Sequence, residues 1–341
     1  MPRALRLEFE GAVYHVLARG QRGDPIVNDD TDRRQWLETL GETVTRAGWK
    51  LLAFVLMNNH FHLLIETPQR TLVSGMKWLQ GTYATRFRLR HGLVGSVFAG
   101  RYKALLIERD DRYLGTVLDY IHLNGWRARQ ATLDRGLDQS RWCSLHWYAL
   151  DPKRRPAWLA AAEGLRWHGL TDTAANRRVF IDRIEMRARC GTRRTDSQSE
   201  ERLGWSAALR RGWCFGSASF RENLLSRAKD LLRSGKDVSY IDCRVRRDVG
   251  EAEAIALLNA ACRLWKWSDE ELFRRRKGDA QKVTLARFIL QRTGVPLSWI
   301  QQHLHTGAPA ATSRLLSHRH ELACSSGQRS RWLADLNEMS K

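Results

Sequence analysis

Two histidines that flank a phenylalanine, His60-Phe61-His62, are the residues of this sequence most suited to chemistry. In a β-strand, residues i and i+2 face the same side, so both imidazoles would point one way and Phe61 into the core. Two imidazoles on one face form half of a divalent-metal site. The alternative is that they are ordinary strand histidines that bind no metal.

A second pair, Tyr120 and Asn124, is spaced four residues apart and therefore shares one face of a predicted helix. A tyrosine hydroxyl can act as a covalent nucleophile, and an amide oxygen can serve as a third metal ligand. His122 lies roughly 200° around the helix from Tyr120 and should not share its face. The alternative is that Tyr120 packs in the core and Asn124 caps the helix end.

The elements that must position these residues alternate between strands and helices. Short apolar stretches predict strands over residues 12–17, 49–57, 60–66 and 101–108, with Asn58-Asn59 as a hairpin turn between the middle two. Apolar residues at helical spacing predict helices that end near Gly48, Gly92 and Asn124. The resulting order β-α-β-β-α-β-α is typical of an α+β, ferredoxin-like split βαβ fold with an extra helix.

The rest of the chain divides into two parts. Residues 151–247 predict a helical or linker region, whose polar stretch at 187–201 is typical of an exposed loop. Residues 248–325 change to short helices separated by Gly-containing turns, the last of them from about Ala311 to His320, which favours an all-α helix-turn-helix module. A small helical bundle that makes protein contacts is the alternative. With the first domain placed at residues 1–150, three regions are predicted.

The charge of the chain indicates its class of partner. Lys and Arg number 57 against 37 Asp and Glu, which gives a net charge of +20 and attracts polyanions such as nucleic acid. No apolar run reaches the ~18 residues of a membrane span, and no signal-peptide pattern is expected at the start. The 6 cysteines form no CxxC pair, which argues against a zinc ribbon. We expect a reduced, cytoplasmic protein located at the nucleoid.

Four ordered blocks of this sequence resemble a known family. They are Gly11–Val16 with Arg19-Gly20, Leu56–Leu64, Gly95–Lys103, and Tyr120–Asn124 with Arg127-Ala128. His60-Phe61-His62 is similar to the histidine-hydrophobic-histidine (HUH) motif of single-strand DNA nucleases. The blocks together resemble the IS200-like Y1 transposases, and within them the bacterial REP-associated tyrosine transposases. The resemblance covers about residues 1 to 150.

The resemblance implies an enzyme that cuts and rejoins DNA. Tyr120 would be the nucleophile, with His60, His62 and Asn124 as ligands of Mg²⁺ or Mn²⁺. The substrate would be single-stranded or hairpin DNA, such as repeat-type palindromes, joined to the protein through a 5′-phosphotyrosine link. The bond energy is kept in that link, so no nucleotide cofactor is needed, and no GxxxxGK[ST] pattern is present. The protein would act as a monomer or homodimer.

Two short stretches depart from the family pattern. Met57-Asn58-Asn59-His60 lacks the proline of the usual Met-Pro-Asn-His, which loosens the turn but removes no ligand. The family's Asn-Pro-Val-Arg-Ala is replaced by a stretch in which Gly125 is expected to end the helix. The large Trp126 that follows is expected to alter the DNA groove or the placement of Tyr120.

A second resemblance lies in the C-terminal part. Residues 272–316 are similar to the DNA-binding domain of the replication initiator DnaA, which implies a duplex-binding helix-turn-helix. The base-reading Asp-His-Thr/Ser-Thr stretch of the initiator is replaced by Ala308–Ser313. The fold is therefore expected to persist without the initiator's sequence preference.

Basic residues near both predicted sites are candidates for DNA contacts. Arg101 and Lys103 share one strand face, where solvated edge charges are the alternative, and Arg127 follows the Tyr120 helix. Four adjacent cations precede the helix-turn-helix: Arg274, Arg275, Arg276 and Lys277. Two rival functions stay open, namely a domesticated DNA-binding regulator with a silent nuclease site, and a single-strand or RNA-binding protein with structural histidines.

Overall fold

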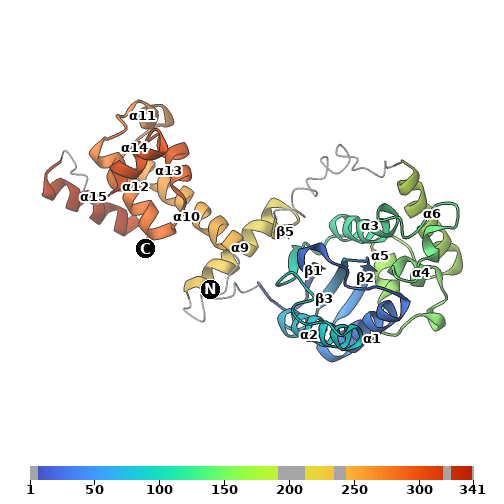
Figure 1. The fold of residues 1–341 in the computed structure, drawn as a ribbon. Coiled ribbons are helices and arrows are strands. Elements are labelled where there is room, and N and C mark those ends of the chain that lie inside the picture. The colour runs from blue at the N-terminus through green and yellow to red at the C-terminus, as the bar shows by residue number, and fades with distance from the viewer. Residues whose placement is uncertain (1–6, 191–211, 234–242, 318–323, 340–341) are drawn as a thin grey trace. The chain divides into compact units, whose positions relative to one another are not determined.

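The computed structural model describes residues 7–190, 212–233, 243–317 and 324–339. The chain divides into two compact units, residues 6–223 and 224–341, each described here by itself (Figure 1). Among the described residues, no helix is long and apolar enough to cross a membrane.

The first unit is built on a mixed α+β arrangement around one sheet. Its first six elements are β1 (Ala12–Arg19), α1 (Asp30–Ala47), β2 (Lys50–Leu56), β3 (His60–Thr67), α2 (Leu72–His91) and β4 (Lys103–Ile107). The sheet order is β2-β3-β1-β4-β5, and the first four strands pair antiparallel. This confirms the predicted split βαβ fold. The short β5 (Cys214–Phe215) adds a parallel strand beside β4.

Local signals in the sequence set the ends of these elements. The carboxylate of Asp29 accepts hydrogen bonds from the backbone N–H groups of Thr31 and Asp32, which caps the start of α1. Gly48 ends α1 at φ 65°, a left-handed conformation that glycine adopts at little cost. The β2–β3 hairpin closes through a hydrogen bond of 2.8 Å from Met57 N–H to the His60 carbonyl.

Helices cover both faces of the sheet. Helices α1 and α2 lie on one face, where the fully buried Phe61 packs against Trp36 of α1 at 5.1 Å between ring centroids. Helix α3 (Asp111–Arg127) lies against the opposite face, which we call the α3 face (Figure 1). Because side chains alternate along a strand, Phe61 and its two histidine neighbours face opposite layers.

The first unit continues past residue 150 with further helices. Helices α4 (Ser144–Ala149), α5 (Ala161–Arg166) and α6 (Ala174–Cys190) pack on α3 and β2. The Ser144 hydroxyl accepts from the N–H of Phe54 and donates to its carbonyl, at 2.9 and 3.0 Å, so α4 is fastened to β2. Short 3₁₀ turns occur at Gln21–Gly23, Leu137–Gln139 and Pro152–Arg154. Of the predicted loop at 187–201, residues up to Cys190 are helical and the others lie outside the described residues.

The second unit is helical, as predicted. Its helices are α10 (Cys243–Leu264), α11 (Asp269–Arg274), α12 (Ala280–Thr293), α13 (Leu297–Leu304), α14 (Pro309–Leu316) and α15 (Ser326–Met339). The division between the units falls within α9 (Ala218–Arg233). The core of the second unit collects buried residues from most of its helices, including Leu257, Val283, Ile289, Ile300 and Leu336. The last predicted helix, 311–320, begins and ends earlier, and residues 318–320 lie outside the described residues.

Candidate active site

Three histidines meet on the α3 face of the sheet. In the antiparallel register of β1 and β3, His62 lies opposite Leu17, His60 opposite Arg19, and His15 opposite Leu64. Residues directly opposite each other share a face, so His15, His60 and His62 all point toward α3. The predicted common face of the two HUH histidines is therefore present, and a third histidine joins it.

His15 and His62 form a buried pair. Nε2 of His15 lies 2.8 Å from Nδ1 of His62, and the two rings meet edge to edge in nearly parallel planes with centroids 5.1 Å apart. Both side chains are almost fully buried. The sequence reasoning missed His15, although the residue stands inside the first block of the family resemblance. Only the pairing register of β1 with β3 brings it beside His62.

Tyr120 of α3 lies beside this pair. Its ring centroid is 5.6 Å from that of His62 and 5.9 Å from that of His15, and both contacts are edge-on. The guanidinium of Arg127, two turns further along α3, lies 5.2 Å from the Tyr120 ring. The structure thus brings the predicted nucleophile together with one predicted metal ligand and one predicted DNA contact.

Asn124 lies one turn after Tyr120 and is buried. Its side-chain amide nitrogen has no hydrogen-bond partner, so an unsatisfied polar atom is buried here. The helix continues past Asn124 to Arg127, which shows that Asn124 does not cap it. An unsatisfied N–H donor on the Tyr120 face suits a hydrogen bond to a substrate, whereas the amide oxygen is the atom of this side chain that can ligate a metal.

His60 is fixed in one tautomer by its neighbour. Its Nδ1 lies 2.7 Å from Oδ1 of Asn59, while Nδ2 of Asn59 donates to the Gly23 carbonyl at 3.1 Å. An amide oxygen can only accept, so Nδ1 of His60 carries the proton and Nε2 keeps its lone pair. The His60 and His62 ring centroids are 5.2 Å apart.

Burial keeps these imidazoles neutral. Desolvation lowers the pKa of His15 to about 3. It also lowers the pKa of His60 to about 4, with a further contribution from the Arg19 cation. The pKa of His62 falls well below its usual value, first through burial and then through its two histidine neighbours. At neutral pH all three rings are uncharged, the state in which imidazole binds a metal.

The donor set fits a divalent cation that keeps open positions. Two neutral imidazoles and the Asn124 amide supply three donors from β3 and α3. Among the described residues, no group of three or more His, Cys, Asp or Glu side chains is placed to hold a metal. A cation here would therefore take its other ligands from water or phosphate oxygens, as Mg²⁺ and similar hard cations do at phosphate sites.

The basic residues predicted near this site have different positions. Lys103 begins β4, lies opposite Leu17, and so shares the α3 face with His62. Arg101 precedes the strand, and both side chains are exposed. Both are therefore accessible to a polyanion, although whether they bind DNA stays a prediction.

Two expectations about the end of α3 are corrected by the structure. Gly125 does not end the helix, because it is buried within α3, where a Cβ would be 3.9 Å from Cys143. Trp126 is buried, with 6% of its surface accessible, so it does not face a DNA groove, and an effect on the placement of Tyr120 stays a prediction. His122 lies apart from the site, as expected, and its Nε2 is 2.8 Å from the Ser144 hydroxyl. Packing against α4 thus extends the helix through these residues.

The four cations of the predicted basic run in the second unit differ in exposure. Arg274, Arg276 and Lys277 are exposed. Arg275 is held instead by Glu271 at 3.4 Å and Asp279 at 3.2 Å, and its guanidinium lies 4.0 Å from the Trp267 ring. Three of the four cations are thus exposed to a ligand. Arg275 instead joins the end of α11 to Asp279 and Trp267.

Helices α13 and α14 follow each other along the chain and are separated by a short turn. The hydroxyl of Thr306 in this turn and that of Thr312 in α14 are both buried and hydrogen-bond at 2.8 Å. The guanidinium of Arg287 in α12 donates to the carbonyls of Leu315 and Ser317 at the end of α14. The hydrogen bonds of Arg287 thus hold the end of α14 against α12, while Ser313 and Arg314 of α14 are exposed.

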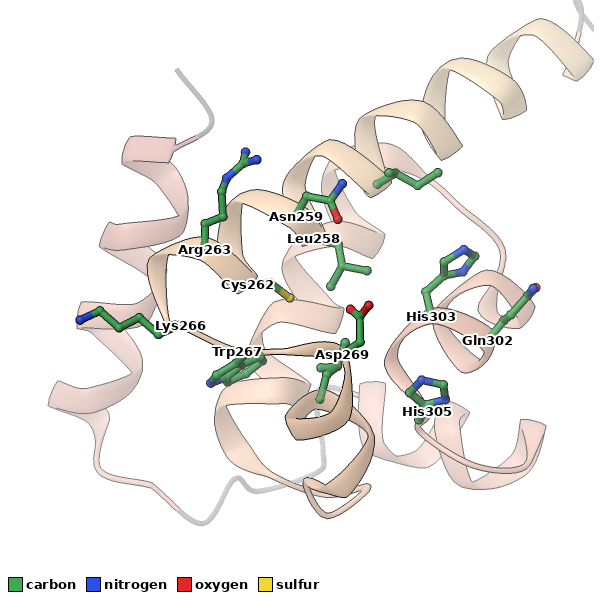
Figure 2. A pocket seen from close by; sticks show the side chains of 12 residues that line it. Leu258, Asn259, Cys262, Arg263, Lys266, Trp267, Asp269, Gln302, His303 and His305 are labelled. Carbon is green, nitrogen blue, oxygen red and sulfur yellow. The ribbon is translucent and has the colours of Figure 1, made fainter. Parts of the chain in front are cut away.

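A cavity of about 860 Å³ lies in the second unit between α10, α11 and α13. Figure 2 shows the Asp269 carboxylate and the His303 and His305 imidazoles around it, with Cys262 and Leu258 contributed by α10. Lys266 extends outward (Figure 2). None of the residues predicted from the sequence to bind metal or DNA lines this cavity.

Comparisons with known proteins bear on the first unit. No curated protein sequence matches the chain. One similar solved structure is described as the REP-associated tyrosine transposase bound to a REP hairpin; it is 15% identical, with 43% of this chain and 84% of that chain covered and a TM-score of 0.36. Another is described as a putative transposase from Deinococcus radiodurans. It is 21% identical, the match covers 35% of this chain and 95% of that chain, and the TM-score is 0.26.

The sequence profile of the family described as "Transposase IS200 like" matches residues 8–124. That span begins just before β1 and ends at Asn124 in α3, so it contains the three histidines and Tyr120. Residues 8–124 of this chain are therefore a transposase domain of the IS200-like family.

Proposed function

We propose that the protein is a metal-dependent tyrosine transposase that cleaves and rejoins single-stranded or hairpin DNA. The observation that carries the proposal is the contact of the Tyr120 ring with His62, at 5.6 Å between centroids, on a face that also holds His60. A tyrosine hydroxyl beside neutral imidazoles is the arrangement that a covalent phosphoryl transfer needs. The IS200-like profile over the same residues supports this chemistry.

In this reaction the phenolic oxygen of Tyr120 attacks a DNA phosphorus atom. The new bond is a 5′-phosphotyrosine link, and the bond to the 3′ oxygen breaks, which leaves a free 3′-OH. Attack by another 3′-OH on the link restores a phosphodiester and releases Tyr120. The number of phosphoester bonds is unchanged, so no nucleotide hydrolysis is required. The Arg127 cation, 5.2 Å from the ring, is placed to stabilise negative charge near the reacting atoms.

His60, His62 and Asn124 are the residues that would hold a divalent cation, Mg²⁺ or Mn²⁺. When bound, the cation would polarise a non-bridging phosphate oxygen and orient the scissile phosphate. The protein's own part is to keep both imidazoles neutral through burial, and to keep the proton of His60 on Nδ1, which donates it to the Asn59 amide oxygen. These contacts leave Nε2 of His60 able to coordinate.

The substrate follows from the shape and charge of the site. Tyr120 is only half exposed on α3, so the phosphate must come to it on a strand that can bend. Lys103 is exposed on the same face of the sheet, Arg101 is exposed just before that strand, and both are proposed to bind the phosphates of the DNA strand. A single strand, or the base of a hairpin, meets both requirements.

For the second unit we propose duplex DNA binding by a DnaA-like helix-turn-helix. Two observations support this proposal. Arg287 holds the end of α14 through two hydrogen bonds, and Arg274, Arg276 and Lys277 are exposed. Such cations contact phosphates and set affinity rather than sequence choice. A regulator with a silent nuclease would keep this binding and lose the chemistry of the first unit.

The test is a cleavage assay on a pool of labelled hairpin oligonucleotides that carry single-stranded flanks. With Mn²⁺, wild-type protein should yield a covalent protein–DNA adduct, which chelation by EDTA should prevent. Tyr120→Phe should form no adduct while it still binds the oligonucleotides. Tyr113→Phe is a matched control, because Tyr113 lies on the same helix but packs against Phe215 at 5.0 Å. Binding without any adduct in the wild type would favour the silent regulator instead.

A further inference from the structure

The Nδ1 atoms of the two HUH histidines have different hydrogen-bond partners. His60 is bound by the Asn59 amide oxygen, which can only accept a hydrogen bond. His62 is bound by the imidazole of His15, at 2.8 Å between Nε2 of His15 and Nδ1 of His62. An imidazole nitrogen can accept or donate according to its protonation, so the proton between these rings can belong to either residue.

The position of that proton decides which nitrogen of His62 is free. If Nδ1 of His62 carries the proton and donates to His15, Nε2 of His62 keeps a lone pair. If His15 donates, the lone pair of His62 is used inside the pair and Nε2 carries the proton. Only the first arrangement matches the tautomer that Asn59 imposes on His60, and only in the first does His62 offer Nε2 to a ligand.

The surroundings favour a specific task for His15. It is 4% exposed, and its neighbours across β3 and β4 are Leu64 and Leu105. A polar ring at such a position must be satisfied by a specific partner, and the hydrogen bond to His62 supplies one. The planes of the two rings are 8° apart and the rings meet through their edges, so the in-plane hydrogen bond also limits the rotation of His62.

We propose that His15 is a positioning residue that holds His62 with its Nε2 lone pair toward the metal-binding position. This inference rests on the proposed function, because it assigns His62 to a metal. His15 itself does not touch the metal or the DNA. Its acceptor nitrogen keeps the proton on Nδ1 of His62, and the in-plane hydrogen bond fixes the orientation of that imidazole.

The test is a calorimetric titration of the full chain with Mn²⁺. His15→Phe keeps an aromatic ring but removes the acceptor, and should weaken Mn²⁺ binding by about 10–100-fold, the range for loss of a partner behind a ligand. His15→Gln places an amide oxygen at comparable reach and should restore affinity to within a few-fold of wild type. His15→Asn, equally polar but shorter, should resemble the phenylalanine variant.

His122 provides a matched control. It is also almost fully buried, and its Nε2 makes one hydrogen bond of 2.8 Å, to Ser144, away from Tyr120. His122→Phe should lower the melting temperature and leave Mn²⁺ affinity unchanged. If His15 were merely structural, its variants would behave in the same way, with a lower melting temperature and wild-type affinity, and the inference would be overturned.

The failure of the proposed function would look different. His60→Ala/His62→Ala should lose Mn²⁺ binding. If that double variant binds Mn²⁺ as well as the wild type, the metal lies elsewhere and both the proposed site and the role of His15 are overturned. If the double variant loses binding while all His15 variants retain it, the site stands and only the role of His15 is overturned.

Discussion

Replacing Arg274, Arg276 and Lys277 by alanine should flatten the salt dependence of duplex DNA binding by the full chain. Each phosphate neutralised on duplex DNA contributes about 0.9 to the slope of log K against log salt, so loss of three contacts should reduce the slope by about 2.7. All three side chains are exposed. The ion pair of Arg274 with Glu270 is long, at 3.7 Å, and exposed, so it does not compete strongly with phosphate.

Arg275 is the internal control for this prediction. Its side chain is only 25% exposed, and its guanidinium contacts two carboxylates and the Trp267 ring. Arg275→Ala should therefore leave the slope unchanged and lower the free energy of unfolding by about 1–2 kcal/mol, through loss of the cation–π contact and the hydrogen bonds.

The assay is fluorescence anisotropy on a labelled duplex over a series of KCl concentrations, with Tyr120→Phe in every variant to prevent cleavage. Guanidinium unfolding of each variant shows whether the fold is retained. A triple variant with the wild-type slope would refute the reasoning, and so would an Arg275→Ala variant that loses a full unit of slope without losing stability. Either result would mean that exposure does not identify the phosphate contacts.

Three further predictions concern the first unit. Phe61→Ala should lower the free energy of unfolding by about 3–5 kcal/mol in thermal or chemical denaturation, because its ring is fully buried against α1; a cost under 1 kcal/mol would contradict this packing. His60→Ala should abolish metal-dependent cleavage without a comparable loss of stability, measured on the hairpin pool, and undiminished cleavage would remove His60 from the site. The free energy of unfolding should fall as the pH is lowered from 7 to 4. In the folded protein the pKa values of His15 and His122 are about 3 each and that of His60 is about 4, all below the unfolded value of 6.5. The unfolded chain therefore binds more protons in this range, which favours unfolding. His122→Phe should make the loss less steep in urea titrations, and an unchanged pH profile would contradict the burial argument.

The sequence predicted those parts of the site that depend on local periodicity. The alternation of a strand places His60 and His62 on one face with Phe61 opposite, and the helical period places Tyr120 and Asn124 together. The order of strands and helices was enough to predict the split βαβ sheet, because few topologies satisfy that order. The shared faces of these two residue pairs need only the spacing of residues along one element.

Features that depend on pairing between distant segments were not predicted. His15 joins the site only through the register of β1 with β3, which places it two residues from the partner of His62. Arg275 looks like its three cationic neighbours in sequence, and only Trp267 and two carboxylates distinguish it. Gly125 suggested a helix end, but the packing of α3 carries the helix past it.

The individual helices after residue 143 also gave no clear local signal. Helices α4 and α5 are only 6 residues each, too short for a clear periodic pattern. Ser144 reads as an ordinary polar residue, yet its hydroxyl bonds both backbone groups of Phe54. Such long-range side-chain contacts to the backbone give no local signal.

The most direct test of the central claim is to locate the covalent link to DNA. Wild-type protein should be incubated with Mn²⁺ and the hairpin pool, digested, and mapped by mass spectrometry. The account predicts a peptide carrying a nucleotide phosphate on Tyr120, present also in Tyr113→Phe and absent from Tyr120→Phe. A phosphodiester link on any other residue, or an adduct that persists in Tyr120→Phe, would contradict it.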